Sequence, residues 1–403
     1  MASARITNAK NASESRAVPD SPRSLYLHIP FCRDRCTYCD FYSTRLMEPQ
    51  VEPYLDALRI ELQRRAAGRS FCNVFIGGGT PTSIPAASLA RFLADLRRLV
   101  KIPAGAEFTV EANPGTLDAE KARVLRDGGV TRVSMGAQTF DPEILKAMRR
   151  IHKPADVARS VGVLRDAGFD NLNLDLIFGY PGQTLDMIQY DINQLAALGV
   201  EHVSAYALTV APETWLGREV AAARIATSDD DLYADMYAGI QKGLAAMGMR
   251  QYEISNFARP GRICAHNLHC WDYGEYTGAG VSAWSFENGR RFGNLRDKVE
   301  YQRRMHAGEA AHDMEEILDA EARLGEMAML KLRTLAGIDA DWWRERAGRP
   351  LRKLARRLQI HIDTGLVQWD KQVLRLAPAG LFVSNAILRD TFATPQGEYM
   401  DVR

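Results

Sequence analysis

Residues 26–41 read YLHIPFCRDRCTYCDF, and this stretch decides which fold the sequence predicts. Three cysteines, Cys32, Cys36 and Cys39, follow an apolar, strand-like run in the spacing C-x3-C-x2-C. Three thiolates can bind three irons of a [4Fe–4S] cubane, and the fourth iron then stays open to chelate the amino and carboxylate groups of a small molecule. Tetrahedral zinc is the alternative, with His28 or Asp40 as its fourth ligand.

Around this stretch, short apolar runs alternate with helical segments. The candidate strands are Ser24–Ile29, Asn73–Gly77, Glu107–Asn113, Arg132–Ala137, Asn171–Phe178 and His202–Leu208. Six successive βα units predict an α/β fold with a parallel sheet, which closes into a partial (βα)6 barrel over residues 24–248. Parallel barrels carry their chemistry at the carboxyl ends of the strands, so the motifs at those ends are candidate site residues.

The remaining segments differ in composition from the barrel. Residues 1–23 are polar and are interpreted as a disordered tail without a secretory signal. Residues 249–312 form a loop-rich linker, and residues 313–403 predict a winged-helix-like C-terminal domain with helices followed by short strands. No apolar run approaches the roughly 18 residues of a membrane span, so we expect a cytoplasmic protein.

The charge pattern gives no indication of a nucleic acid partner. The net charge of the 403 residues is +1. The basic stretch at 352–357 is interpreted as a solvated helix face, and DNA binding is the alternative for this stretch.

Several residues after the predicted strands have side chains suited to binding a polar cofactor. Gly77-Gly78-Gly79-Thr80 lets the backbone approach a ligand closely, although a tight turn would need the same glycines. Glu111 ends the third strand, where its carboxylate could accept hydrogen bonds from a cofactor. The alternative interpretation is a solvated or salt-bridged acid. Asp175 lies inside an apolar strand, where a charge is costly unless it is paired. Arg150 is a cation that can meet a carboxylate.

These motifs resemble the radical S-adenosylmethionine family over roughly residues 24–390. Within that family they resemble the branch of oxygen-independent coproporphyrinogen III oxidase and the HemW-like heme chaperones. The resemblance implies a [4Fe–4S] cluster and S-adenosylmethionine as cofactors. The cofactor-binding residues that it implies are Tyr26, Tyr38, Gly78, Gly79, Thr80, Glu111, Gln138, Arg150 and Asp175.

Two features favour the chaperone side of this branch. The oxidase has a further cysteine where this chain has Phe41, and it has a longer segment before the cluster motif. The hexapeptide His266-Asn-Leu-His-Cys270-Trp271 matches the chaperone pattern His-Asn-x-x-Tyr-Trp, with Cys270 in place of the tyrosine. The resemblance therefore implies heme contacts by His266, Cys270 and Trp271. The alternative interpretation is that His266 and Trp271 only support the structure at the barrel mouth.

We therefore expect a heme chaperone that binds heme as its cargo and transfers it to client proteins such as respiratory enzymes. An oxygen-independent coproporphyrinogen III oxidase, or another radical enzyme of porphyrin metabolism, is the alternative. The fold has the potential to cleave S-adenosylmethionine, and the sequence leaves both the enzymatic status and a homodimer open.

Overall fold

The computed structural model describes residues 23–392. Six parallel strands form the centre of its main sheet and follow one another in sequence order. They are β1 (Ser24–Ile29), β4 (Asn73–Gly78), β5 (Glu107–Ala112), β6 (Arg132–Gln138), β7 (Leu172–Phe178) and β8 (His202–Ala207). Each lies within a residue or two of the predicted strand, so the partial barrel is confirmed. Residues 1–22 of the predicted tail lie outside the described residues.

Side chains alternate between the two faces of each barrel strand. In β1, Leu25, Leu27 and Ile29 are fully buried in the main hydrophobic core. Tyr26 and His28 project from the opposite face, because successive residues of a strand point to opposite sides. The inner face of the barrel is therefore lined by polar and aromatic side chains.

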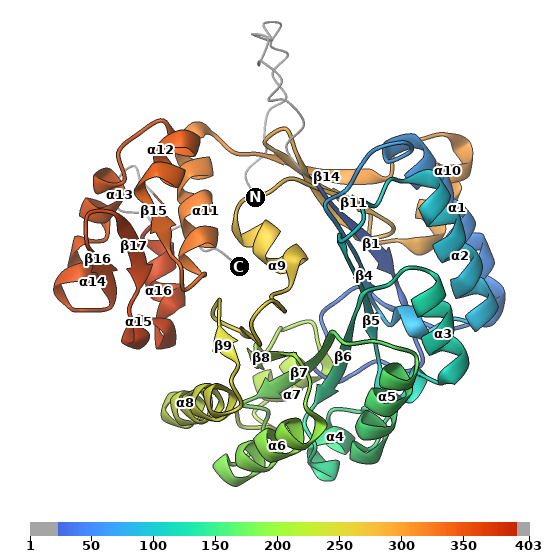
Figure 1. Ribbon diagram of the computed structural model, residues 1–403, viewed down its shortest axis with the longest axis horizontal. Coiled ribbons are helices and arrows are strands. Elements are labelled where there is room, and N and C mark those ends of the chain that lie inside the picture. Colours follow the sequence, from blue (N-terminus) through green and yellow to red (C-terminus); the bar gives the residue numbers. More distant parts are fainter. Residues whose placement is uncertain (1–22, 393–403) are drawn as a thin grey trace, which may run out of the picture.

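Helices cover the outer face of the curved sheet (Figure 1). They are α1 (Val51–Arg65), α2 (Ala86–Leu99), α3 (Ala119–Asp127), α4 (Pro142–Ala147), α5 (Pro154–Asp166), α6 (Leu185–Leu198) and α8 (Asp230–Ala246). The short α7 (Trp215–Ala221) follows β8. In α1, Val51, Leu55, Leu58 and Leu62 recur with a helical period and are buried, as amphipathic packing requires.

The segment 249–312, which the sequence indicates as a linker, adds strands to both edges of the same sheet. β9 (Arg250–Gln251) and β10 (Asn256–Ala258) extend the edge beyond β8, whereas β11 (Tyr276–Ala279) pairs in parallel with β1. β12 (Trp284–Glu287) and β13 (Arg290–Asn294) continue outward from β11, followed by β14 (His312–Ile317). Most of β14 lies in the stretch 313–403, which the sequence predicts as the C-terminal domain, but it pairs with the main sheet. These strands escape prediction because they have only two to six residues and two of them, β11 and β13, contain glycine.

Two helices of this segment complete the barrel region. α10 (Lys298–Ala307) packs against α1. α9 (Ala265–Trp271) crosses from the β10 edge of the sheet to the β11 edge. Figure 1 shows α9 at the open side of the curved sheet, between the barrel strands and the C-terminal module.

The C-terminal module consists of small helices and a three-stranded antiparallel sheet of order β15-β17-β16. Its helices are α11 (Ala320–Leu332), α12 (Ala340–Ala347), α13 (Arg352–Arg357), α14 (Gln359–Asp363), α15 (Pro378–Phe382) and α16 (Ser384–Arg389). Its strands are β15 (Ile338–Asp339), β16 (Val367–Trp369) and β17 (Val373–Leu376). The hairpin β16–β17 after several helices has the winged-helix arrangement that the sequence predicts.

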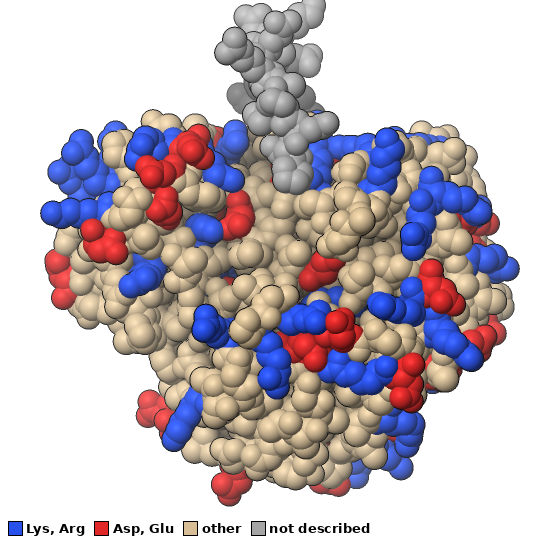
Figure 2. Space-filling model, viewed as in Figure 1, with Lys and Arg blue, Asp and Glu red and all other residues tan. Residues whose placement is uncertain are grey.

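The molecular surface carries charges of both signs. On the face drawn in Figure 2, Lys and Arg side chains are interspersed with Asp and Glu side chains. The basic residues of α13 are exposed and flank Leu354 and Ala355, which face the core. None of the helices within residues 23–392 combines the length and apolar character that a membrane span needs.

Candidate functional site

The cysteine loop leaves the carboxyl end of β1 and is held by backbone contacts on both sides. β2 (Phe31–Cys32) pairs with β3 (Thr44–Arg45), which closes the loop at its base. Within the loop, the Thr37 amide donates to the Met148 carbonyl at 3.2 Å, and the Leu216 amide of α7 donates to the Thr37 carbonyl at 2.9 Å. The three cysteines therefore sit on a loop that the surrounding barrel fixes.

The glycine loop after β4 lies against the start of the cysteine loop. The Gly79 amide donates to the Ile29 carbonyl at 2.9 Å, and Cys32 Sγ lies 3.6 Å from Thr80 Oγ1. A Cβ atom added at Gly79 would lie 2.7 Å from the Pro30 carbonyl carbon, and one at Gly77 would lie 2.7 Å from Glu111 Oε2. Because no side chain fits at these positions, the loop keeps bare backbone beside the cysteines.

Two buried carboxyl groups face the same part of the barrel interior. Glu111 Oε2 accepts a hydrogen bond from the Gly78 amide at 3.1 Å. Burial, followed by repulsion from Asp175, raises the pKa of Glu111 to about 8. Burial also raises the pKa of Asp175, although Asn173 Nδ2 donates to its Oδ1 at 2.7 Å. These carboxyl groups have acceptor capacity that protein donors satisfy only in part.

Arg150 connects the cysteine loop with the end of β6. Its Nη1 donates to Cys36 Sγ at 3.4 Å and its Nη2 to the Gly136 carbonyl at 2.5 Å, while its buried Nε has no partner. Gln138 has a φ of 68°, a conformation that side chains other than glycine rarely adopt. A Cβ added at Gly136 would lie 2.5 Å from Gln138 Nε2 and 3.0 Å from Arg150 Nη2. Gly136 is therefore a site residue that the motif analysis missed.

The remaining predicted cofactor residues lie beside these groups. Burial raises the pKa of Tyr26, and negative charge on Glu111 raises it further. Tyr38 is buried close to Arg150, and burial likewise raises its pKa. Gly78, Glu111 and Gln138 lie at the carboxyl ends of β4, β5 and β6, whereas Tyr26 and Asp175 lie in the middle of β1 and β7, and Tyr26 also lines the cavity described below.

The donor set fits a cubane cluster with a polar cofactor beside it. Cys36 Sγ accepts a hydrogen bond from the Arg150 guanidinium, so the loop places a cation beside the cysteines. Within residues 23–392, no three His, Cys, Asp or Glu side chains are grouped around a single ion position. The thiolates of a cubane bind separate irons and need not converge. His28, the alternative zinc ligand, has both ring nitrogens engaged, with the Tyr42 carbonyl at 2.9 Å and Tyr26 Oη at 3.2 Å.

His266 belongs to a second site at the opposite, amino-terminal ends of the strands. Its Nδ1 lies 3.0 Å from Asn73 Oδ1 and 2.6 Å from Ser24 Oγ, where β4 and β1 begin. Since Asn73 Oδ1 can only accept, the proton of the neutral ring sits on Nδ1. Burial lowers the pKa of His266 to about 3, so Nε2 keeps its lone pair at neutral pH.

Cys270 follows His266 by one turn of α9, and its Sγ lies 3.9 Å from His266 Nε2. Burial raises the pKa of the Cys270 thiol to about 12. The imidazole is packed against Phe75, with the ring centroids 4.8 Å apart. The unprotonated Nε2 of a fixed imidazole and the Cys270 thiol, which can donate to it, thus lie side by side.

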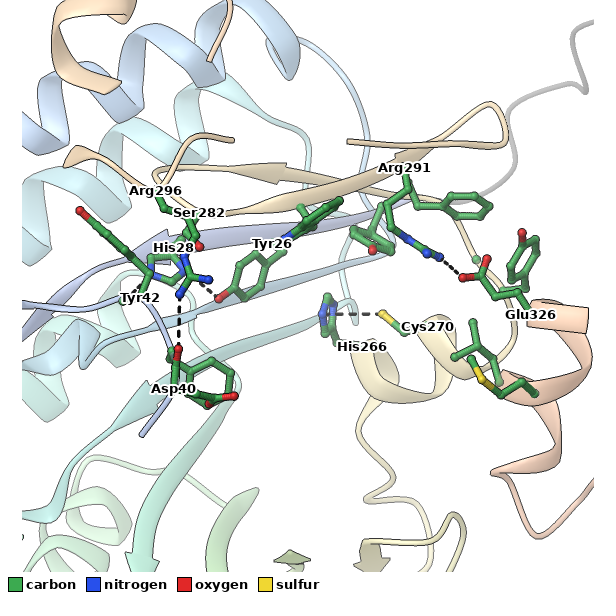
Figure 3. A pocket seen from close by; sticks show the side chains of 18 residues that line it. Tyr26, His28, Asp40, Tyr42, His266, Cys270, Ser282, Arg291, Arg296 and Glu326 are labelled. Atoms are coloured by element: carbon green, nitrogen blue, oxygen red, sulfur yellow. Dashed lines mark hydrogen bonds and ion pairs between the residues drawn. The ribbon is translucent and has the colours of Figure 1, made fainter. Parts of the chain in front are cut away.

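A cavity of about 660 Å³ runs beside these two side chains. Its walls come from β1, the end of the cysteine loop, α9, β11, β12 and α11. Aromatic residues make up much of the lining: Tyr26, Phe41, Tyr42, Tyr273, Tyr276, Trp284 and Phe286. In the close view, Tyr26 and His266 lie between Arg296 at one end and Arg291 with Glu326 at the other (Figure 3).

Trp271 does not line this cavity. The Arg333 guanidinium lies 5.0 Å from the centre of its ring, so the indole faces the segment that follows α11. The reason is the helical period, since residue 271 projects from a different side of α9 than residues 266 and 270. Among the three residues of the predicted heme motif, two are therefore brought together and the third packs against the C-terminal module.

The side chains that hold α9 also escaped the sequence analysis. Glu107 Oε1 accepts from the Ala265 amide at 3.0 Å and from the His266 amide at 3.4 Å, which caps the start of α9. Ser24, Asn73 and Glu107 are polar residues at the start of three neighbouring strands. That repeated pattern is the signal from which a polar site at this end of the barrel was predictable.

Comparisons with known proteins were made for sequence and for fold. Residues 26–195 match the Radical SAM superfamily, and residues 318–383 match the HemN C-terminal domain. Heme chaperone HemW of Bacillus subtilis (strain 168) is 35% identical over 371 residues, which cover 91% of this chain and 98% of that protein. Heme chaperone HemW of Escherichia coli (strain K12) is 38% identical over 276 residues, which cover 67% and 72% respectively.

Among solved structures, coproporphyrinogen III oxidase (HemN) from Escherichia coli, a radical SAM enzyme, has the same fold. The TM-score is 0.83, with coverage of 94% of this chain and 92% of the oxidase. The sequence identity is 23%, so this likeness concerns the fold alone.

Proposed function

The chain belongs to the HemW family of heme chaperones, and we propose that it binds heme and transfers it to client proteins. It carries the radical SAM and HemN C-terminal domains. Respiratory enzymes are the class of client that we propose, with the cytoplasm as the compartment. The observation that carries the proposal is the aromatic cavity beside His266 and Cys270. Its size and lining suit a planar macrocycle, and its donors suit an iron at the centre of that macrocycle.

We propose that the iron ligand comes from α9. His266 offers a neutral Nε2 whose ring orientation is fixed by Asn73 and Ser24, as supporting hydrogen bonds fix metal-binding imidazoles. Cys270 offers a sulfur beside that nitrogen. Both donors lie on one face of α9 and line the cavity, so either can reach an iron bound there.

In this proposal the cofactors lie at the carboxyl ends of the strands, where the end of the cysteine loop also borders the cavity. Cys32, Cys36 and Cys39 hold a [4Fe–4S] cluster, and the bare backbone of the glycine loop, Glu111, Gln138, Arg150 and Asp175 hold S-adenosylmethionine. When bound, the cluster can supply an electron for cleavage of a carbon–sulfur bond. The residues of this chain bind and orient: Arg150 neutralises a carboxylate, and Glu111 accepts hydrogen bonds from hydroxyl groups.

The position of the cavity supports transfer of the cargo. One wall is formed by the barrel and the other by α11 of the C-terminal module, so a small movement of the module exposes the cavity. A bound heme held by one protein ligand can be released without breaking the fold. Such an arrangement suits a carrier better than an enzyme that must retain its macrocycle through several reaction steps.

A transfer experiment tests this function. The anaerobically reconstituted chain is loaded with heme and mixed with apomyoglobin as an acceptor probe, and separate reactions contain coproporphyrinogen III, S-adenosylmethionine and a reductant. We expect heme to pass to the acceptor and no protoporphyrinogen to form, since Phe41 replaces the additional cysteine of the oxidase. Multiple turnover of coproporphyrinogen III, or failure to bind heme, would contradict the chaperone function.

A further inference from the structure

Two arginines line the cavity, and they differ in how their charge is balanced. Arg291 is paired twice, through Nη2 to Glu326 at 2.6 Å and through Nη1 to Glu316 at 3.1 Å. Arg296, which follows β13, makes a single contact, from Nη2 to the Asp40 carbonyl at 3.5 Å. Within the described chain, Arg296 forms no ion pair with any carboxylate, and Asp40 meets it only through the backbone.

The Arg296 side chain is exposed, so its charge is solvated by water rather than paired with a protein carboxylate in the described part of the chain. The nearby His28 is buried and neutral, and Arg296 contributes to lowering its pKa to about 4. Phe41 and Tyr42 provide aromatic surface at the same end of the cavity. In Figure 3, Arg296 and Ser282 stand at this end, and Tyr26 leads from them towards His266. An exposed guanidinium that pairs with no carboxylate of the described residues therefore stands at one end of the aromatic cavity, and the iron donors lie further along it.

We infer that Arg296 binds an ionised carboxylate on the edge of the macrocycle, so that the cavity selects an iron tetrapyrrole with acidic side chains over the same tetrapyrrole without them. The inference rests on the proposed heme binding and adds a residue that determines specificity. A planar guanidinium donates two parallel hydrogen bonds to a carboxylate, which gives orientation as well as affinity. Arg291 could bind the same carboxylate only after its ion pairs with Glu326 and Glu316 were broken. The acidic edge of the ligand accordingly points towards Arg296.

Heme and its dimethyl ester provide the test, because the ester retains the iron and the ring but carries no carboxylate charge. Both are titrated into the anaerobically reconstituted full chain, under identical detergent and salt conditions, and the ratio of the two affinities is the measured quantity. We expect heme to bind about tenfold more tightly than the ester, as a charge-assisted hydrogen bond gained only by the acid requires.

Three variants assign the preference to one residue. Arg296→Gln should bring the affinity ratio close to one, and Arg296→Lys should retain part of the preference. Arg291→Gln, the matched control with a paired arginine, should keep the ratio of the unsubstituted chain. Equal affinities in the unsubstituted chain, or an unchanged ratio in Arg296→Gln, would overturn the inference while leaving heme binding intact. Failure of both compounds to bind would contradict the proposed function itself, and the inference with it.

Discussion

Burial sets the ionisation of the candidate site residues in opposite ways at the two ends of the barrel. His266 is kept neutral as a base, and Glu111 is kept protonated as an acid, because the same low-dielectric interior disfavours either charge. The neutral imidazole suits a metal. The protonated carboxyl can donate a hydrogen bond as well as accept one.

Glu111 makes the stability of the cofactor-free protein dependent on pH. Its pKa is raised from 4.5 to about 8 in the folded state, so the unfolded chain releases this proton first and stability falls as the pH rises through that window. Glu111→Gln should remove this loss of stability. The unfolding free energy of the variant should therefore gain at least about 1 kcal/mol relative to that of the unsubstituted chain between pH 5 and pH 8, since one pKa unit corresponds to about 1.4 kcal/mol.

Urea unfolding at several pH values measures this gap, with Glu120→Gln, an exposed carboxyl on α3, as the control. Parallel pH profiles for the unsubstituted chain and Glu111→Gln would show that Glu111 is ionised in the fold.

The six cysteines should separate into two groups by their effect on iron content. After anaerobic reconstitution we expect about four irons per chain, as a cubane requires. Cys32→Ala, Cys36→Ala and Cys39→Ala should each lose this iron. Cys72→Ala, Cys264→Ala and Cys270→Ala should retain it, because these cysteines lie at the other end of the barrel. Stoichiometric zinc without iron in every preparation would rule the cluster out.

The cysteines and glycines of the cofactor site were predictable because their spacing is local in sequence. Ser24 and Asn73, as polar residues at strand starts, carried a signal for a polar site, but their contact with His266 was not predictable, since polar residues in strands usually indicate a solvent-exposed face. Here they face the inside of a barrel, where His266 arrives from a helix more than 190 residues further along than Asn73. Only closure of the sheet brings them together.

At the level of elements, α9 depends on the barrel for its position. It has seven residues, too few for stability in isolation, and its first turn is capped by Glu107 from β5. The sequence predicts the barrel strands well because each contains several apolar residues and is followed by a helical segment. It does not predict α9 or the outer strands, because their stability comes from neighbours rather than from their own pattern.

Removal of the Glu107 cap should weaken heme binding without touching the heme site directly. Glu107→Ala leaves the Ala265 and His266 amides without an acceptor, which costs about 1–2 kcal/mol of stability and frees α9 to shift. Heme affinity should fall several-fold. Asp229→Ala removes a comparable cap, from the Leu232 amide of α8, and should cost similar stability with unchanged heme affinity. Equal heme affinities in both variants would show that α9 positioning is unimportant.

At the level of the whole molecule, the cavity exists only because two parts of the chain meet. α11 contributes Glu326, Met329 and Leu330 to a cavity whose other walls are the barrel and its added strands. The Glu326–Arg291 ion pair and the Lys331–Asp272 ion pair join the module to the rest. No sequence pattern predicts such a cavity, since its residues are spread from Tyr26 to Leu330.

The rate of heme release should depend on the ion pair that joins the module to the barrel. Glu326→Gln removes the partly buried carboxylate that Arg291 binds, so the module opens more readily and heme should dissociate several-fold faster. Glu321→Gln breaks the exposed pair with Arg349 inside the module and should leave the rate unchanged. Stopped-flow transfer to excess apomyoglobin measures both rates, and identical release from the two variants would exclude the module as the gate.

Heme titration of the reconstituted chain, followed by the Soret band, tests most directly whether heme binds at α9. We expect His266→Ala and Cys270→Ser each to shift the spectrum, and the double variant to lose at least about tenfold in affinity because no iron donor remains. His269→Ala is the control, since its Nε2 contacts the Glu275 carbonyl at 2.7 Å and its side chain does not line the cavity. Heme binding by the double variant with the spectrum and affinity of the unsubstituted chain would contradict this account.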